Sequence, residues 1–171
     1  MKEKIQKKLF HLWTGECVAA VMFVVLWVLY VPMFDWAADY LTPLPTIYAF
    51  SLLEFILLQG GLYWYLKWNH VRKNQNYKLS TDKLRIFSVF KRINLFLITI
   101  GLIILLVALY RSDIYRGFYA FLYGFAVVEY INYFHIRLSY MSIEELRELM
   151  KQKGFRQSIL AKELTMYRKK L

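Results

Sequence analysis

The sequence predicts an all-α integral membrane protein with four transmembrane helices, both termini in the cytoplasm, and a basic amphipathic helical tail. Three observations predict this fold class. Apolar residues make up 58% of the 171 residues and aromatic residues 19%, which is richer than in an ordinary soluble domain. Four long stretches of the chain carry almost no charge. The Lys and Arg residues gather in blocks between these stretches rather than along one face.

The four stretches are each long enough to cross a bilayer. They hold 26, 27, 18 and 20 residues between flanking charges, and about 20 helical residues cross the roughly 30 Å of hydrocarbon. Helices are required because unpaired backbone groups are costly in lipid, and four segments are too few for a closed barrel. The predicted helices cover about 10–33, 45–66, 82–110 and 115–137. They form one domain over 1–140, and 141–171 forms the tail.

The first two helices are separated by an outer loop, "VPMFDWAADYLTPLP". The basic N-terminus precedes a long apolar run without a small-residue cleavage pattern, so we interpret it as a retained helix and not as a signal peptide. Pro32, Pro43 and Pro45 mark the helix ends on either side of the loop. Trp36 and Tyr40 suit the membrane interface.

The third helix is predicted to begin in the cytoplasm, with Ser80 or Thr81 as N-cap, before it enters the lipid. The short "RSDIYR" turn makes the third and fourth helices antiparallel neighbours. Tyrosines recur along the fourth helix, and packing between helices explains them more simply than a cofactor site. These are Tyr119, Tyr123, Tyr130 and Tyr133.

The tail contains two amphipathic segments. Ser142 and Glu145 have the spacing of a capping box, and Gly154 can end the helix that they begin. A second apolar stripe follows among basic residues. It suits attachment to anionic inner-leaflet lipids, at about 1 kcal/mol per basic residue. Packing against a cytoplasmic partner or the protein's own loop is the alternative. The stripe comprises Phe155, Ile159, Leu160, Leu164 and Tyr167.

The distribution of charge predicts the orientation. The flanks on the side of the two termini hold 21 Lys and Arg residues, and the flanks on the other side hold 2. The positive-inside rule therefore places both termini on the cytoplasmic side of a bacterial-type plasma (inner) membrane. Nucleic acid is not an expected partner, despite the net charge of +11, because the basic blocks are separated by apolar runs. The single cysteine, Cys17, excludes an intrachain disulfide.

Three glutamates interrupt the apolar stretches. A charge at mid-membrane costs at least about 2.5–3.5 kcal/mol, so Glu16, Glu54 and Glu129 must be protonated, paired or hydrated. Counting helical rise places Glu16 and Glu129 at a similar level in the inner half and Glu54 nearer the centre. Asn132 lies one turn from Glu129. The sequence therefore predicts an intramembrane polar cluster of these four residues, although each glutamate could instead only fasten helices together.

His11, His135 and Arg137 are candidate groups at the inner interface. No cysteine and histidine spacing indicates a metal site, and no cofactor is implied. Enzyme signatures are absent: the chain has no Gly-rich phosphate loop, nucleophile-elbow serine or His-Glu-x-x-His. No catalytic residue can therefore be assigned from a motif.

Three functions remain open. The polar cluster could bind or conduct a small cation or proton, or the chain could be an accessory subunit of a membrane assembly. It could instead be a membrane-embedded enzyme acting on a lipid or lipid-linked headgroup, with Glu129 as general base. A non-catalytic regulator or scaffold is the third. The small size favours a homo-oligomer or larger complex if the protein transports.

Overall fold

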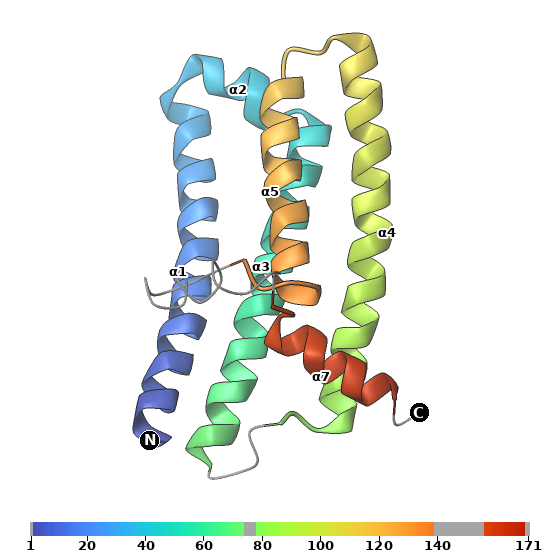
Figure 1. Cartoon of the computed structure of the whole chain (residues 1–171). Helices are drawn as coiled ribbons and strands as arrows, with labels where there is room; N and C mark the ends of the chain where they lie inside the picture. The colour runs from blue at the N-terminus through green and yellow to red at the C-terminus, as the bar shows by residue number, and fades with distance from the viewer. Residues whose placement is uncertain (1, 74–77, 139–155, 170–171) are drawn as a thin grey trace.

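The computed structural model describes residues 2–73, 78–138 and 156–169, and over these residues the chain is all-α (Figure 1). Four long helices lie side by side, and two short helices lie at opposite ends of them. The beginning of the first long helix, the end of the second, the beginning of the third and the last short helix share one end (Figure 1). The helices are α1 (Lys2–Met33), α2 (Asp35–Leu41), α3 (Leu44–Arg72), α4 (Thr81–Arg111), α5 (Arg116–Phe134) and α7 (Ile159–Arg168).

Three of the long helices are long and apolar enough to span a membrane, namely α1, α3 and α4. They support the prediction of a membrane protein. The fourth, α5, has 19 residues and is not among them. Its tyrosines, Glu129 and Asn132 lower its mean hydropathy.

The helix ends differ from the predicted spans because charge marks where lipid ends, not where a helix ends. α1 starts at Lys2 and α3 continues to Arg72, since no breaker precedes Phe10 or follows Leu66. α5 stops at Phe134, because Ile136 pairs with Gln157 of the tail and cannot continue the helix. Part of the predicted outer loop is also helical, as α2.

The central helix is α3, which packs against α1, α4 and α5. Most of its apolar stretch is buried, whereas α1 and α4 expose theirs. Tyrosine hydroxyls tie α4 to its neighbours by donating to its backbone carbonyls. Tyr48 donates to Leu97 O at 2.7 Å, Tyr119 to Gly101 O at 2.7 Å, and Tyr123 to Ile98 O at 2.9 Å. The tyrosines of α5 therefore contribute hydrogen bonds as well as packing.

A reciprocal amide pair joins α3 to α4. Gln59 Nε2 donates to Asn94 Oδ1 at 3.1 Å, and Asn94 Nδ2 donates to Gln59 Oε1 at 2.8 Å; both side chains are buried. Asn94→Leu should lower the free energy of unfolding by about 2 kcal/mol, because it leaves a buried amide unpaired. The double variant Gln59→Leu/Asn94→Leu should lose less than Asn94→Leu alone. Thermal unfolding in detergent measures both, and a double variant weaker than the single one would contradict the pairing.

The tail returns to the bundle through α7. A short antiparallel bridge joins Ile136 to Gln157. Ser158 caps α7 by accepting from Ala161 N at 3.0 Å and donates to Tyr133 O. The buried face of α7 packs on α4 and α5.

At the centre of that face, Glu163 forms an ion pair with Lys67 of α3, and both side chains are buried. The Tyr63 hydroxyl also donates to Glu163, at 3.3 Å. Much of the stripe that could have entered the leaflet is thus buried against the protein's own helices, while Lys162 and Arg168 remain exposed. The predicted helix that begins at Ser142 lies outside the described residues.

Candidate functional site

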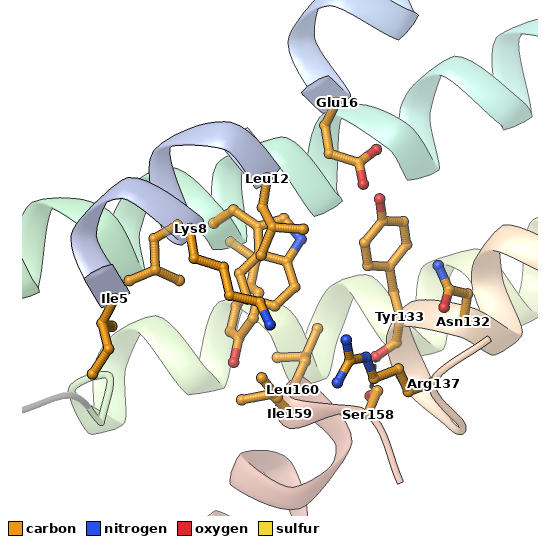
Figure 2. Close-up of a pocket in the computed structure, with 13 residues that line it drawn as sticks. Ile5, Lys8, Leu12, Glu16, Asn132, Tyr133, Arg137, Ser158, Ile159 and Leu160 are labelled. Atoms are coloured by element: carbon orange, nitrogen blue, oxygen red, sulfur yellow. Dashed lines mark hydrogen bonds between the residues drawn. The ribbon is translucent and has the colours of Figure 1, made fainter. Parts of the chain in front are cut away.

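A cavity of about 350 Å³ lies between α1, the end of α5 and α7, with α3 behind it (Figure 2). It combines an apolar wall with a small set of polar groups, as small-molecule sites usually do. The apolar wall comprises Ile5, Leu9, Leu12, Trp64, Ile159 and Leu160. The polar groups belong to Lys8, Glu16, Tyr63, Asn132, Tyr133, Arg137 and Ser158.

Helical periodicity on α1 brings its polar groups to this cavity. Lys8, Leu12 and Glu16 follow one another at intervals of four residues, so their side chains lie along one side of the helix. Gly60 and Gly61 of α3 then allow close approach from two directions. A β-carbon at Gly61 would lie 3.6 Å from the Glu16 side chain, and one at Gly60 would overlap the ring of Tyr133.

The Glu16 carboxylate and the Tyr133 hydroxyl face one another at the end of the cavity that is farther from the N-terminus of α1 (Figure 2). The two groups interact electrostatically and lie within hydrogen-bonding range of each other, although the contact does not meet strict geometric limits for a hydrogen bond.

Glu129 lies near this pair. Its carboxyl group interacts electrostatically with both Glu16 and Tyr133, and it accepts a hydrogen bond from Asn132 Nδ2 at 3.3 Å. Asn132 Oδ1 accepts in turn from Leu138 N at 2.9 Å. Asn132 thus fastens the chain that leaves α5 and also lines the cavity.

Glu54 lies apart from the other two glutamates. It is seven residues, about two helical turns, before Gly61, and it does not line the cavity. Its Oε1 is buried without a hydrogen-bond partner among the described residues. The structure therefore brings together Glu16, Glu129 and Asn132 of the predicted cluster but not Glu54, because α3 places Glu54 farther along its axis.

Of the three candidate residues at the inner interface, only one lines the cavity. His11 is exposed and its ring contacts Phe10. His135 follows α5 and lies beside Tyr130, with 3.5 Å between its Nε2 and the tyrosine hydroxyl. Partial desolvation and the nearby Lys91 ammonium lower the pKa of His135 below its ordinary value.

Arg137 lines the cavity, and its backbone N–H donates to Arg156 O at 2.9 Å. Figure 2 shows its guanidinium and the Lys8 ammonium both directed into the cavity, from opposite walls. The sequence predicts Arg137 only as a group at the inner interface. Among the described residues that line the cavity, two are cations and one is a glutamate.

Sequence reasoning overlooked Lys8, Tyr133 and Ser158 as cavity residues. Lys8 looked like one more flanking charge, and Tyr133 like its three neighbours in the tyrosine stripe. The adjacent glycines at 60 and 61, in the middle of a predicted span, were the available signal, since small residues mark close approach of helices in membranes.

A second, larger hollow of about 820 Å³ lies between α1 and α5 near α2. Its walls are apolar and aromatic, with Trp27, Trp36 and Phe118 among them, and none of the residues that line it is charged. It offers an apolar chain a place to lie but no ionisable group. The candidate site is therefore the smaller, polar cavity.

The polar cavity can hold an anion near Lys8 and Arg137 and a hydrogen-bonding group near Glu16 and Tyr133. Among the described residues no group of three or more side chains is arranged to hold a metal ion. The chain was compared with protein-family models, curated proteins and solved structures, and it matches none of them.

Proposed function

We propose that the protein is a four-span plasma-membrane protein whose cavity binds the phosphate-bearing headgroup of an anionic inner-leaflet lipid. The observation that carries this proposal is the pair of cations, Lys8 and Arg137, directed into one cavity from separate walls (Figure 2). Phosphate is the group that such a pair recognises best, because its oxygens accept charge-assisted hydrogen bonds from both. The same pair disfavours a small cation, so this function is preferred to cation binding.

The topology rests on charge and on the geometry of α5. The start of α1, the end of α3, the start of α4 and α7, which carry most of the described Lys and Arg residues, lie at one end of the bundle (Figure 1), which the positive-inside rule assigns to the cytoplasm. The 19 residues of α5 extend about 28 Å, close to the thickness of the hydrocarbon. A fourth span is therefore long enough, and its polar residues face protein partners.

A lipid is a better candidate ligand than a soluble anion because the walls of the cavity are largely apolar. Apolar side chains such as Leu9, Leu12 and Ile159 make up much of the lining. α1 packs mainly on α3 and has little contact with α5, so the cavity lies where two helices diverge. A lipid could enter sideways with its headgroup in the cavity and its acyl chain in the bilayer.

The test is native mass spectrometry of the full chain, which counts bound lipids after release from detergent. Diacyl glycerophosphate should be retained more strongly than phosphatidylcholine. Lys8→Gln/Arg137→Gln should reduce that retention about tenfold or more, because two charge-assisted contacts are lost. Lys4→Gln/Arg85→Gln is the matched control, since it removes the same charge from exposed positions outside the cavity.

The proposal is wrong if the cavity variant and the control variant lose anionic lipid equally. That outcome would mean that net charge alone attracts the lipid. Retention of phosphatidylcholine and diacyl glycerophosphate in equal amounts by the wild-type chain would also overturn it.

A further inference from the structure

The apolar hollow lies in the same groove as the polar cavity. Both are bordered by α1 and α5, two helices that have little contact with one another and pack on α3 instead. On α1 the polar cavity extends to Glu16 and the hollow begins at Phe23; on α5 the hollow extends to Phe125 and the polar cavity begins at Asn132. Both helices therefore place the two sites in line along the groove, with about 10 Å between them.

The depth of the hollow sets the length of chain that reaches it. Phe23 follows Lys8 by 15 residues, about 22 Å along α1, and Tyr30 follows it by 22 residues, about 33 Å. The acyl chain of an inner-leaflet lipid ends at the middle of the bilayer, about 20–22 Å from the headgroup surface. Such a chain ends where the hollow begins. A lipid with its phosphate at Lys8 and Arg137 therefore fills the hollow only if its chain is longer than one leaflet.

At its far end the hollow is bounded by α2. Trp36, Tyr40 and Leu41 of this helix line it, and α2 lies at the end of the bundle opposite the N-terminus (Figure 1). None of the residues that line the hollow is charged, so no ion pair there fixes the headgroup of a lipid from the opposite leaflet. A chain that extends from the polar cavity is therefore the favoured occupant.

Small and apolar side chains join the two sites. On α5, Val128 lies between the residues that border them and is 46% exposed. On α1, Ala19 and Ala20 occupy the matching level. The two carboxyl groups near this level, Glu16 and Glu129, interact with protein side chains, so the chain does not have to pair with them.

The lining of the hollow suits an unsaturated, methyl-branched chain. Rings of α1 and α5 meet across the groove: Phe23 and Phe125 have 6.0 Å between their ring centroids, and Trp27 and Phe118 have 6.3 Å. Ring faces make dispersion contacts with flat carbon–carbon double bonds and with methyl groups. The hollow, at about 820 Å³, is also larger than the polar cavity, at about 350 Å³, as a ligand with a small headgroup and a bulky chain requires.

We infer that one polyprenyl phosphate occupies both sites, with its phosphate between Lys8 and Arg137 and its isoprenoid chain along the α1–α5 groove into the hollow. This inference rests on the proposed function and names the lipid class within it. A polyprenyl phosphate joins a small anionic headgroup to a single chain longer than one leaflet. That combination is what the spacing and the lining of the two sites require.

The experiment compares three prenyl lipids, each bound to the full chain and counted by native mass spectrometry. Undecaprenyl phosphate has the phosphate and a chain longer than one leaflet. Farnesyl phosphate has the phosphate on a short chain, and undecaprenol has the long chain without the phosphate. The wild-type chain should retain undecaprenyl phosphate about tenfold more strongly than either of the other two, because only this lipid engages both sites at once.

Gly117→Leu should remove the advantage of the long chain. Gly117 lines the hollow, and a β-carbon there would meet nothing within 4 Å, so leucine should fit the fold and take up space that the chain needs. Retention of farnesyl phosphate should not change. Gly15→Leu is the matched control: a β-carbon at this helical glycine also meets nothing within 4 Å, and the residue lines neither site. It should leave the retention of all three lipids unchanged.

The possible failures are distinguishable. Equal retention of undecaprenyl phosphate and farnesyl phosphate, both above undecaprenol, would overturn this inference and leave the proposed function in place. Equal retention of undecaprenol and undecaprenyl phosphate, with farnesyl phosphate no better retained than phosphatidylcholine, would overturn both. If Gly117→Leu retained undecaprenyl phosphate as strongly as Gly15→Leu did, the chain would lie outside the hollow and the inference would be wrong.

Discussion

Lys67→Met should weaken the attachment of α7 to the bundle by about 3–5 kcal/mol, the usual cost of removing one partner from a buried ion pair. Lys67 is fully buried near the C-terminal end of α3, and its partner Glu163 is 7% exposed. The substitution leaves the Glu163 carboxylate buried, with the Tyr63 hydroxyl as a donor but without the opposite charge. The fraction of molecules in which α7 is detached from the other helices should therefore increase.

Limited proteolysis within α7, together with thermal unfolding in detergent, measures this effect. Lys162→Met is the matched control, because Lys162 adjoins Glu163 in the sequence but is exposed, and it should leave α7 protected. Lys67→Met/Glu163→Leu should recover much of the loss, since no buried charge remains. Equal cleavage of Lys67→Met and Lys162→Met would show that the ion pair does not hold α7.

Attachment of α7 also bears on the cavity, because Ser158, Ile159 and Leu160 form part of its wall. Release of the helix should therefore reduce lipid retention along with protease resistance. The ion pair joins residues 96 positions apart. It thus couples α7 to the cavity, although neither Lys67 nor Glu163 lies where the phosphate would bind.

The sequence predicted the long helices well because length and hydropathy are local properties. It predicted the α7 contact poorly, because periodicity does not tell which cation of a basic flank is buried. Lys67 was counted with the other charges that follow the second apolar stretch. Glu163 carried a recognisable signal: it falls between Leu160 and Leu164 on the apolar stripe of its helix, where an acidic residue needs a buried partner.

The sequence predicted how deep the candidate site residues lie along their helices, but not the direction in which their side chains point. Counting residues placed Glu16 and Glu129 at one level, and their carboxyl groups do interact. The same counting could not show that Glu54 lies farther along α3, outside the cavity. Nor could it separate Tyr133 from the tyrosines that face α4, because that difference depends on the surface of a neighbouring helix.

Gly60→Ala should lower the free energy of unfolding by about 3 kcal/mol, near the upper end for overpacking in a well-packed interior. A β-carbon at position 60 would lie 2.5 Å from the Tyr133 hydroxyl oxygen and closer than 3.0 Å to the ring. The ring is buried, so relief requires movement of α5 or of Tyr133 itself. Displacement of Tyr133 should also reduce the retention of diacyl glycerophosphate, because Tyr133 lines the cavity.

Two other helical glycines provide matched controls for this substitution. A β-carbon at Gly15 or Gly124 would meet nothing within 4 Å, so alanine there should raise stability by about 0.5–1 kcal/mol through helix propensity. Gly60→Ala/Tyr133→Leu should recover stability, because the smaller side chain vacates the overlapping space, but it should not recover the retention of diacyl glycerophosphate. Thermal unfolding combined with native mass spectrometry separates the two effects. If Gly60→Ala behaved like Gly15→Ala in both measurements, the close packing of Tyr133 on α3, and with it the orientation of its hydroxyl toward Glu16, would be wrong.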